Sequence, residues 1–318
     1  MSKRNSVKVS VIIPTFNAEP YIKQALESVI NQTETDLEVI VCDDLSTDNT
    51  VAVVEGMVLS DCRIKLIKNN QNQGPSCSRN RAISEANGFW IALLDADDFY
   101  HPERLNKLIE IAELNNADLV ADNVFYVDIN GQNPLIAFPE TTHEKNFKII
   151  SVTEFIANDF PIKTGFNYGY LKPIVRRSFL KNHMIRYDEH VRLGEDFMLY
   201  TECLLQGAIF VLTNQPYYYY RRVPQSLSRT GDNTKYQELR DNNLKLINSA
   251  KKVGKMTVVK LLEKRQKRYD KLMLYYDIVR LIKQWRFYSA AKKLITNPKS
   301  WITCVRMSSR YLKRIFLK

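Results

Sequence analysis

The chain has 318 residues, of which 45% are hydrophobic and 25% are charged, and its formal net charge is +11. This composition is that of a globular protein and excludes an intrinsically disordered chain. No apolar stretch approaches the roughly 20 residues of a transmembrane helix, and the five cysteines are scattered without a CxxC pair, which argues against a disulfide framework and a zinc site.

The positive charge lies at one end of the chain. Residues 235–318 contain 23 Lys or Arg and 5 Asp or Glu, whereas residues 1–234 contain 23 basic and 30 acidic side chains. We therefore predict two units, a mildly acidic body at residues 1–230 and a basic α-helical region at residues 231–318. Residues 1–5 lead into a strand without the apolar block of a signal peptide, so we expect a cytoplasmic protein.

Strands and helices alternate over the first hundred residues. Short runs rich in β-branched residues predict buried strands, and apolar residues at helical spacing between them predict helices. The expected elements are a strand at 7–13, a helix at 19–31, a strand at 37–42, a helix at 46–58, a strand at 64–67, a helix at 77–87 and a strand at 89–94. This alternation is typical of an α/β fold with a parallel sheet.

Polar residues follow three of these strands, at 15–17, at 43–44 and at 95–98. Because ligands of open α/β sheets bind outside the carboxyl ends of the strands, we expect these three loops to meet at one site. The last loop holds the carboxylates Asp95, Asp97 and Asp98 within four residues, and such a group is stable when a cation lies among them. Mg2+ or Mn2+ carrying a diphosphate would suit these oxygen ligands. Taken alone, the segment would equally suit a solvated acidic turn.

Two further segments have a functional and a plain structural interpretation. Gly74 precedes a helix that carries Arg79 and Arg81, which favours phosphate binding at a helix N-terminus but also fits an ordinary turn with surface arginines. Neither GxGxxG nor GxxxxGK[ST] is present, so folds that depend on those loops are disfavoured. Glu195 and Asp196 fit either a general base or acidic residues in the first turn of a helix.

The remaining elements are less regular. We predict a helix at 101–115, a strand at 119–126, a polar loop at 128–146, a helix at 197–206, a strand at 209–212 and basic helices after residue 231. Tyr217 to Tyr220 fit a core strand, an aromatic platform for a sugar, or both.

Four motifs in this order resemble the family 2 glycosyltransferases, especially the bacterial exopolysaccharide enzymes of the succinoglycan type. They are Val11–Asn17, Asp43–Thr50, Asp95–Asp98 and Gly194–Asp196, and the likeness covers residues 8–230. The resemblance implies a GT-A fold, a Rossmann-like and mostly parallel central sheet with flanking helices. It also implies inverting, metal-dependent transfer of a sugar from a nucleotide-sugar, expected to be a UDP-sugar, to a glycan or polyprenyl-linked acceptor in bacterial surface polysaccharide synthesis.

The resemblance also implies roles for individual residues, with Mn2+ or Mg2+ as cofactor. Asp196 matches the catalytic base and Glu195 would support it. Arg222-Val223 departs from the His common in relatives, which weakens the assignments nearby. The implied donor-binding residues are Pro14, Thr15, Phe16, Asn17, Asp43, Asp44, Gly74, Arg79, Asp95, Ala96 and Asp97, the metal ligands Asp97, Asp98 and Asp95, and the diphosphate or acceptor contacts Arg221, Ser226 and Ser228.

Two other functions fit the same motifs. A nucleotidyltransferase of GT-A-like fold also uses paired aspartates but releases pyrophosphate. An inactive nucleotide-sugar-binding module would keep the fold without turnover, although the intact set of acidic residues argues against it.

The basic region predicts a membrane-surface helix. Trp301, Ile302, Val305, Leu312, Ile315 and Phe316 fall on one side of a helical wheel, opposite Arg306, Arg310, Lys313 and Arg314, and a similar stretch spans residues 281–287. This pattern favours binding to an anionic membrane, peripheral on the inner face of the cell membrane. Packing against the body is the plainer interpretation. Nucleic-acid binding finds no supporting motif.

Overall fold

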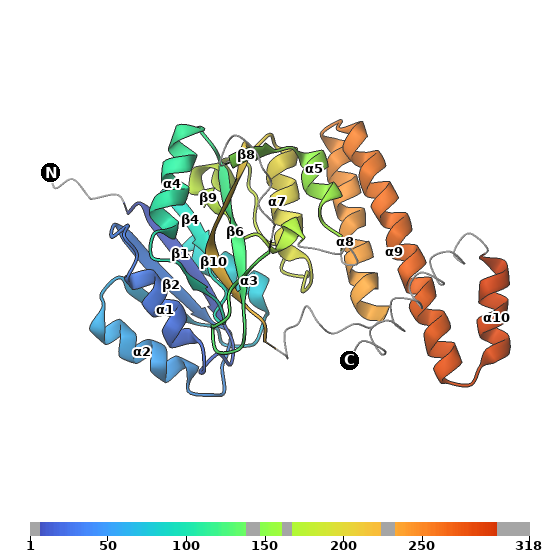
Figure 1. Cartoon of the computed structure of the whole chain (residues 1–318), viewed down its shortest axis with the longest axis horizontal. Coiled ribbons are helices and arrows are strands. Elements are labelled where there is room, and N and C mark those ends of the chain that lie inside the picture. Colours follow the sequence, from blue (N-terminus) through green and yellow to red (C-terminus); the bar gives the residue numbers. More distant parts are fainter. Residues whose placement is uncertain (1–6, 138–146, 161–166, 224–232, 298–318) are drawn as a thin grey trace. The chain divides into compact units, whose positions relative to one another are not determined.

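The computed structural model describes residues 7–137, 147–160, 167–223 and 233–297. The chain forms two compact units, one within residues 1–226 and the other within residues 227–318 (Figure 1). The boundary between them falls in residues 224–232, outside the described part.

The first unit is an α/β structure. Its elements are β1 (Val9–Thr15), α1 (Ile22–Ile30), β2 (Leu37–Asp43), α2 (Thr50–Ser60), β3 (Ile64–Lys68), α3 (Pro75–Ser84), β4 (Trp90–Leu93), β5 (Phe99–Tyr100), α4 (Arg104–Leu114), β6 (Leu119–Val127), β7 (Leu135–Ile136), β8 (Phe147–Ile150), α5 (Val152–Ala157), the short 3-10 helix η1 (Tyr168–Tyr170), β9 (Ile174–Arg176), α6 (Arg177–Asn182), α7 (Glu195–Leu205) and β10 (Phe210–Arg221). The predicted alternation over the first hundred residues is present.

One sheet runs through this unit in the order β3-β2-β1-β4-β9-β6-β10-β5, with β7 beside β6 and β8 beside β10. β3, β2, β1, β4, β6 and β10 run in one direction, whereas β9 and β5 run against them. Helices pack against the sheet (Figure 1). The predicted α/β fold with a mostly parallel central sheet and flanking helices is confirmed.

The core follows from the sequence pattern. β1 and β2 are buried almost throughout, as expected of strands covered on both faces. α1 buries Ile22, Ala25, Leu26 and Val29, which recur at helical spacing on one face. Gly88 precedes β4 where the chain lies close to the start of β1, and a Cβ atom there would lie 2.3 Å from the backbone nitrogen of Ser10. No larger residue fits at this close approach without moving the backbone.

Several boundaries differ from the prediction. α2 begins at Thr50, because the carboxylate of Asp48 accepts hydrogen bonds from the Thr50 backbone N–H and hydroxyl, and Ser46 instead accepts one from the Asn17 backbone N–H. The predicted strand at 209–212 and the tyrosine run form the single strand β10. The predicted loop at 128–146 contains β7, and its residues 138–146 lie outside the described part.

A buried ion pair joins α4 to β6. Two nitrogens of the Arg104 guanidinium donate to the two oxygens of Asp122, at 3.1 and 2.7 Å, and both side chains are almost completely buried. The ring of Tyr100 lies 4.3 Å from the guanidinium carbon. The pair therefore ties the helix to the sheet next to the acidic loop at 95–98.

We expect Arg104→Met to lower the free energy of unfolding by about 3–5 kcal/mol, because the Asp122 carboxylate would stay buried without its partner. Urea denaturation followed by circular dichroism measures this change. Lys68→Met is the matched control, since Lys68 pairs with Glu55 at a half-exposed surface site and such pairs contribute little. Equal stability of the two variants would contradict the prediction.

The second unit is helical in its described part. α8 (Asn233–Lys252), α9 (Met256–Lys283) and α10 (Phe287–Thr296) follow one another with short connections. None of the helices in the described ranges is both long enough and apolar enough to span a bilayer. The predicted amphipathic helix at 301–316 lies outside the described residues.

Candidate functional site

Three of the predicted polar loops leave the same edge of the sheet. Thr15 ends β1 and is in register with Asp43, which ends β2. β4 pairs with β1 on the other side and ends at Leu93, so that Asp95 is the second residue after the end of a neighbouring parallel strand. The three acidic or hydroxyl-bearing strand ends are therefore neighbours, as expected from the parallel order.

Asp44 anchors the loop that leads into α3. Its carboxylate accepts hydrogen bonds from the backbone N–H groups of Gln73 and Gly74, at 3.0 and 2.7 Å, and from the Asn69 side chain at 2.8 Å. Gly74 has φ +87°, a left-handed conformation that glycine adopts without steric cost. The buried Asp44 side chain thus fixes the N-terminus of α3, the helix that carries Arg79.

Asp43 and Thr15 keep polar atoms without partners. Oδ2 of Asp43 accepts a hydrogen bond from the Ser46 backbone N–H at 3.0 Å. Its Oδ1 and the Thr15 Oγ1 are buried, and among the described residues neither has a hydrogen-bond partner. Leaving a buried polar atom without a hydrogen-bond partner costs free energy. A bound ligand could supply the missing hydrogen bonds to these two atoms.

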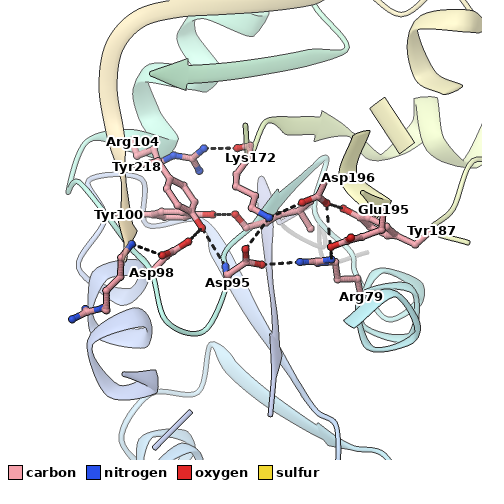
Figure 2. A network of polar contacts seen from close by, with 12 residues as sticks. Arg79, Asp95, Asp98, Tyr100, Arg104, Lys172, Tyr187, Glu195, Asp196 and Tyr218 are labelled. Carbon is pink, nitrogen blue, oxygen red and sulfur yellow. Dashed lines mark hydrogen bonds and ion pairs between the residues drawn. The ribbon is translucent and has the colours of Figure 1, made fainter. Parts of the chain in front are cut away.

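Asp95 lies between two buried cations (Figure 2). Arg79 contacts its Oδ1 at 2.8 Å and Lys172 contacts its Oδ2 at 2.8 Å. Burial would raise the pKa of Asp95, but the charges of Lys172 and Arg79 outweigh it and lower that pKa well below its usual value. Burial would lower the pKa of Lys172, but Asp196 and Asp95 hold it well above its usual value. All three groups are therefore charged.

The same cations hold the acidic pair at the start of α7. Lys172 contacts Oδ2 of Asp196 at 2.6 Å, and the Tyr187 hydroxyl donates to Oδ1 of Asp196 at 2.9 Å (Figure 2). Arg79 contacts Oε1 of Glu195 at 2.9 Å. Burial raises the pKa of Glu195, and the neighbouring charge of Asp196 adds to that effect. Arg79 and Lys172 thus connect α3, the loop after β4 and α7.

Asp98 is held by the end of β10. The Tyr218 hydroxyl donates to its Oδ2 at 2.6 Å, and the Arg221 backbone N–H donates to its Oδ1 at 2.8 Å. The Arg221 side chain donates to the backbone carbonyls of Asp97 and Ile129, each at 2.7 Å. Arg221 therefore fixes the backbone of the loop at 95–98. This structural role is not part of the prediction, which gives Arg221 a contact with a diphosphate or an acceptor.

Asp97 differs from its neighbours. Within the described ranges its carboxylate makes no ion pair and accepts no side-chain hydrogen bond. Burial raises the pKa of Asp97 to about 6, and the charge of Asp95 adds to the effect. Its surroundings thus disfavour the charged form of the Asp97 carboxylate, and a cation bound beside it would favour that form.

The described side chains do not form a complete metal site by themselves. In residues 7–137, 147–160, 167–223 and 233–297 no three His, Cys, Asp or Glu side chains are arranged to hold an ion. The carboxylates of Asp95 and Asp98 have both oxygens engaged, so their predicted roles as ligands would require an exchange of partners. The residues fit a Mg2+ or Mn2+ ion that takes Asp97 from the protein and its other ligands from a diphosphate.

The other predicted donor-binding residues surround these strand ends. Pro14 lies in β1, and Phe16, which is exposed, is the first residue after that strand. Asn17 accepts a hydrogen bond from the Thr47 backbone N–H at 2.8 Å, which joins the loop after β1 to the loop after β2. Ala96 is buried between Asp95 and Asp97. Ser226 and Ser228 lie outside the described residues, and all of these binding roles stay predictions.

Lys172 and Tyr187 are not among the residues predicted from the sequence, and the sequence predicts Tyr218 only as part of a strand or an aromatic platform for a sugar, not as a partner of Asp98. The one available signal for Lys172 is its position in Leu171-Lys172-Pro173-Ile174-Val175, where a single charge interrupts an apolar run. Such a lysine is seldom buried without a carboxylate partner. The two tyrosines carry no comparable signal, because their roles depend on the distant residues that face them.

The chain is similar to known proteins in sequence and in fold. A sequence model described as Glycosyl transferase family 2 matches residues 10–179. The chain is similar to the succinoglycan biosynthesis protein ExoO of Rhizobium meliloti (strain 1021), with 35% identity over 221 residues that cover 70% of this chain and 62% of ExoO. The chain therefore spans less than two thirds of that relative.

Two further similarities concern nucleotide-sugar chemistry. The Escherichia coli protein named UDP-Glc:alpha-D-GlcNAc-diphosphoundecaprenol beta-1,3-glucosyltransferase WfgD is 36% identical over 141 residues, which cover 44% of this chain and 55% of WfgD. The crystal structure of S. aureus TarS 1–349 in complex with UDP superposes with a TM-score of 0.59 at 25% identity, covering 76% of this chain and 65% of that one.

Proposed function

The chain belongs to glycosyltransferase family 2, and from that membership we propose that it transfers a sugar from a UDP-sugar to a hydroxyl of a glycan or lipid-linked oligosaccharide in bacterial surface polysaccharide synthesis. The family predicted from the four sequence motifs is thereby confirmed. The observation that carries the proposed activity is the unpaired Asp97 carboxylate beside the network of Asp95, Glu195 and Asp196. Asp97 would bind a cation, and the network beside it contains Asp196, a candidate general base.

We assign recognition of the nucleobase to the ends of β1 and β2. Oδ1 of Asp43 and Oγ1 of Thr15 are buried without partners, and a uracil ring offers an N–H donor and carbonyl acceptors that suit a carboxylate and a hydroxyl. UDP is favoured over other nucleotides because TarS was crystallised with UDP and WfgD is named for UDP-glucose. Asp44 would act indirectly, by fixing the loop at 72–74.

Asp97 is the residue that would bind Mn2+ or Mg2+ together with the donor diphosphate. When bound, the ion would supply a positive charge that stabilises the leaving nucleoside diphosphate. Arg221 keeps the Asp97 backbone in place through its hydrogen bond to the carbonyl. Asp95, neutralised by Arg79 and Lys172, would position the loop and contribute little net negative charge of its own.

Asp196 is the candidate general base. Lys172 and Tyr187 fix the orientation of its carboxylate, and each carboxylate oxygen has a second lone pair to accept a proton from an acceptor hydroxyl. Attack of that hydroxyl on the anomeric carbon breaks the bond to the diphosphate in one displacement. The configuration inverts, and no covalent enzyme intermediate is required, in contrast to a retaining glycosidase.

The proposed activity is tested by incubating the full chain with UDP-glucose, UDP-galactose and UDP-N-acetylhexosamines, with an oligosaccharide acceptor, and with Mn2+, Mg2+ or EDTA. We expect release of UDP that depends on the acceptor and on the metal. Release of pyrophosphate would instead identify a nucleotidyltransferase. Tight UDP binding without any turnover across donors and acceptors would favour an inactive binding module.

We further propose that the helical second unit places the enzyme at the inner face of the cell membrane. The excess of Lys and Arg in residues 235–318 supports this placement. An acceptor carried on a polyprenyl diphosphate, the class named for WfgD, would be presented at such a surface.

A further inference from the structure

The turn between α9 and α10 exposes a cluster of large apolar side chains. Trp285 is 81% exposed and Tyr288 is 82% exposed, and Ile282 and Phe287 beside them are also exposed. The rings of Trp285 and Phe287 contact each other edge to face, with centroids 5.8 Å apart. We call Ile282, Trp285, Phe287 and Tyr288 the turn cluster.

The turn cluster is not the core of the helical hairpin. α10 folds back alongside α9 (Figure 1), and the contact between them is made by Ile278, Leu281 and Ala290, with Leu274 and Leu294 packed against it. Ile282, Tyr288 and Ile295 lie outside this contact and are exposed. The apolar residues that hold α9 and α10 together are therefore buried, and a second set of apolar residues on the same hairpin is exposed to solvent.

Trp285 occupies a position that normally suits glycine. The Arg286 backbone N–H donates to the Leu281 carbonyl and the Trp285 N–H donates to the Ile282 carbonyl, which is the hydrogen-bond pattern of a Schellman helix end. The residue in the left-handed conformation of that motif is usually glycine, whereas here it is Trp285, with φ +58°. A bulky residue is strained in this conformation, and the mostly exposed Trp285 side chain has the edge-to-face contact with Phe287 but no buried environment to offset that strain.

The same segment of the chain carries cations that have no carboxylate partner among the described residues. Lys283, Arg286 and Lys292 are exposed and, among the described residues, take part in no ion pair. Asp277, the nearest acidic residue in the sequence, already pairs with Arg280 and Lys293. From residue 278 to residue 297 the chain contains no acidic residue.

From these observations we propose that the α9–α10 turn inserts into the interface of an anionic lipid bilayer. Trp and Tyr rings are enriched at that depth of a membrane, and the three unpaired cations would meet anionic headgroups. The shape favours lipid over a protein groove, because the cluster is at a tight turn between two helices. This inference rests on the proposed membrane location and assigns it to described residues separate from the predicted helix at 301–316.

The test uses the full chain and vesicles of phosphatidylcholine with or without phosphatidylglycerol, in the absence of donor and acceptor. We expect flotation with the anionic vesicles alone. Trp285→Gly should lower the bound fraction about tenfold, and Lys283→Glu about fivefold. Because glycine suits the left-handed position, Trp285→Gly should leave the thermal unfolding temperature unchanged or raise it, so that loss of binding cannot be attributed to unfolding.

Matched controls lie in the first unit. Leu59→Ser changes an apolar residue on α2 that is 90% exposed, and Lys181→Glu reverses an exposed cation on α6. Neither should change flotation by as much as the turn variants. Transfer to a water-soluble acceptor should be unaffected in all four, which separates this inference from the proposed activity: wild-type protein that floats but transfers no sugar refutes the activity alone.

Three results would overturn the inference. Absence of flotation by the wild-type chain would do so, and so would unchanged flotation of a Trp285→Gly, Tyr288→Ser double variant, which would assign membrane binding to other residues. Sedimentation velocity adds a third arm. If Trp285→Gly converts a dimer to a monomer while flotation is unchanged, the turn is a contact between copies of the chain and the lipid assignment is wrong.

Discussion

Asp97→Asn is expected to lower kcat/KM for sugar transfer by about 10³-fold while the protein stays folded. The substitution keeps the size of the side chain and removes the one acidic-loop carboxylate that, in the described structure, makes neither an ion pair nor a side-chain hydrogen bond. Loss of a group that stabilises charge on the leaving diphosphate costs roughly this much. Calorimetry should also show that Mn2+ no longer strengthens UDP binding, which is a readout independent of turnover.

The pH dependence of Mn2+-assisted UDP binding sharpens this test. Because burial raises the pKa of Asp97 to about 6 in the metal-free protein, the proton competes with the metal only as the pH falls through that value. Apparent Mn2+ affinity should be constant above pH 6 and fall about tenfold per pH unit below it. Asp36→Asn, which changes an exposed carboxylate before β2, is the control. Wild-type turnover in Asp97→Asn would remove this residue from the mechanism.

Asp196→Asn should separate binding from chemistry. An amide cannot accept the acceptor's proton, so kcat should fall by about 10²–10⁴-fold, whereas calorimetric UDP affinity should stay within error because the donor residues proposed at β1, β2 and the acidic loop are unchanged. Lys172 retains its contact with Asp95 in this variant, so a large loss of stability is not expected. Circular dichroism and thermal unfolding check that point.

Glu195→Gln is the matched comparison, because it removes a neighbouring charge from the same turn of α7. It weakens one contact of Arg79 and should cost less in kcat than Asp196→Asn. If Glu195→Gln is inactive and Asp196→Asn is active, the base is Glu195 and the role assigned to Asp196 is wrong.

The parts of the fold that could be predicted are those encoded locally. β1 to β4 and the helices between them follow from apolar periodicity within single segments. β9 could not be predicted, because three residues, Ile174 to Arg176, gain their place from pairing with β4 and β6, which are distant in the sequence. The tyrosine run continues the strand that begins at Phe210 for the same reason, since β6 pairs along its length.

The candidate site divides in a similar way. Motif order identifies which acidic residues gather, but it does not distinguish adjacent carboxylates whose side chains point in different directions. Asp43 keeps an oxygen without a partner, whereas Asp44 is fully engaged at the start of α3. Likewise the sequence presents Asp95, Asp97 and Asp98 as one acidic group. Only the structure shows that their surroundings differ, because Lys172 and Arg79 contact Asp95 and Tyr218 contacts Asp98.

The position of β9 has a consequence for how the chain reaches its native state. β4 and β6 are neighbours only through this strand, so in a nascent chain that ends before residue 174 the half-sheet β3-β2-β1-β4 has an open edge at β4, and β6 is paired with β7 alone, because β10 has not yet been made. Lys172 emerges from the ribosome just ahead of β9, and the acidic loop therefore gains its second counter-charge as the sheet becomes continuous. Expressing the first unit as two fragments divided just before β9 should yield fragments that are inactive until they are recombined.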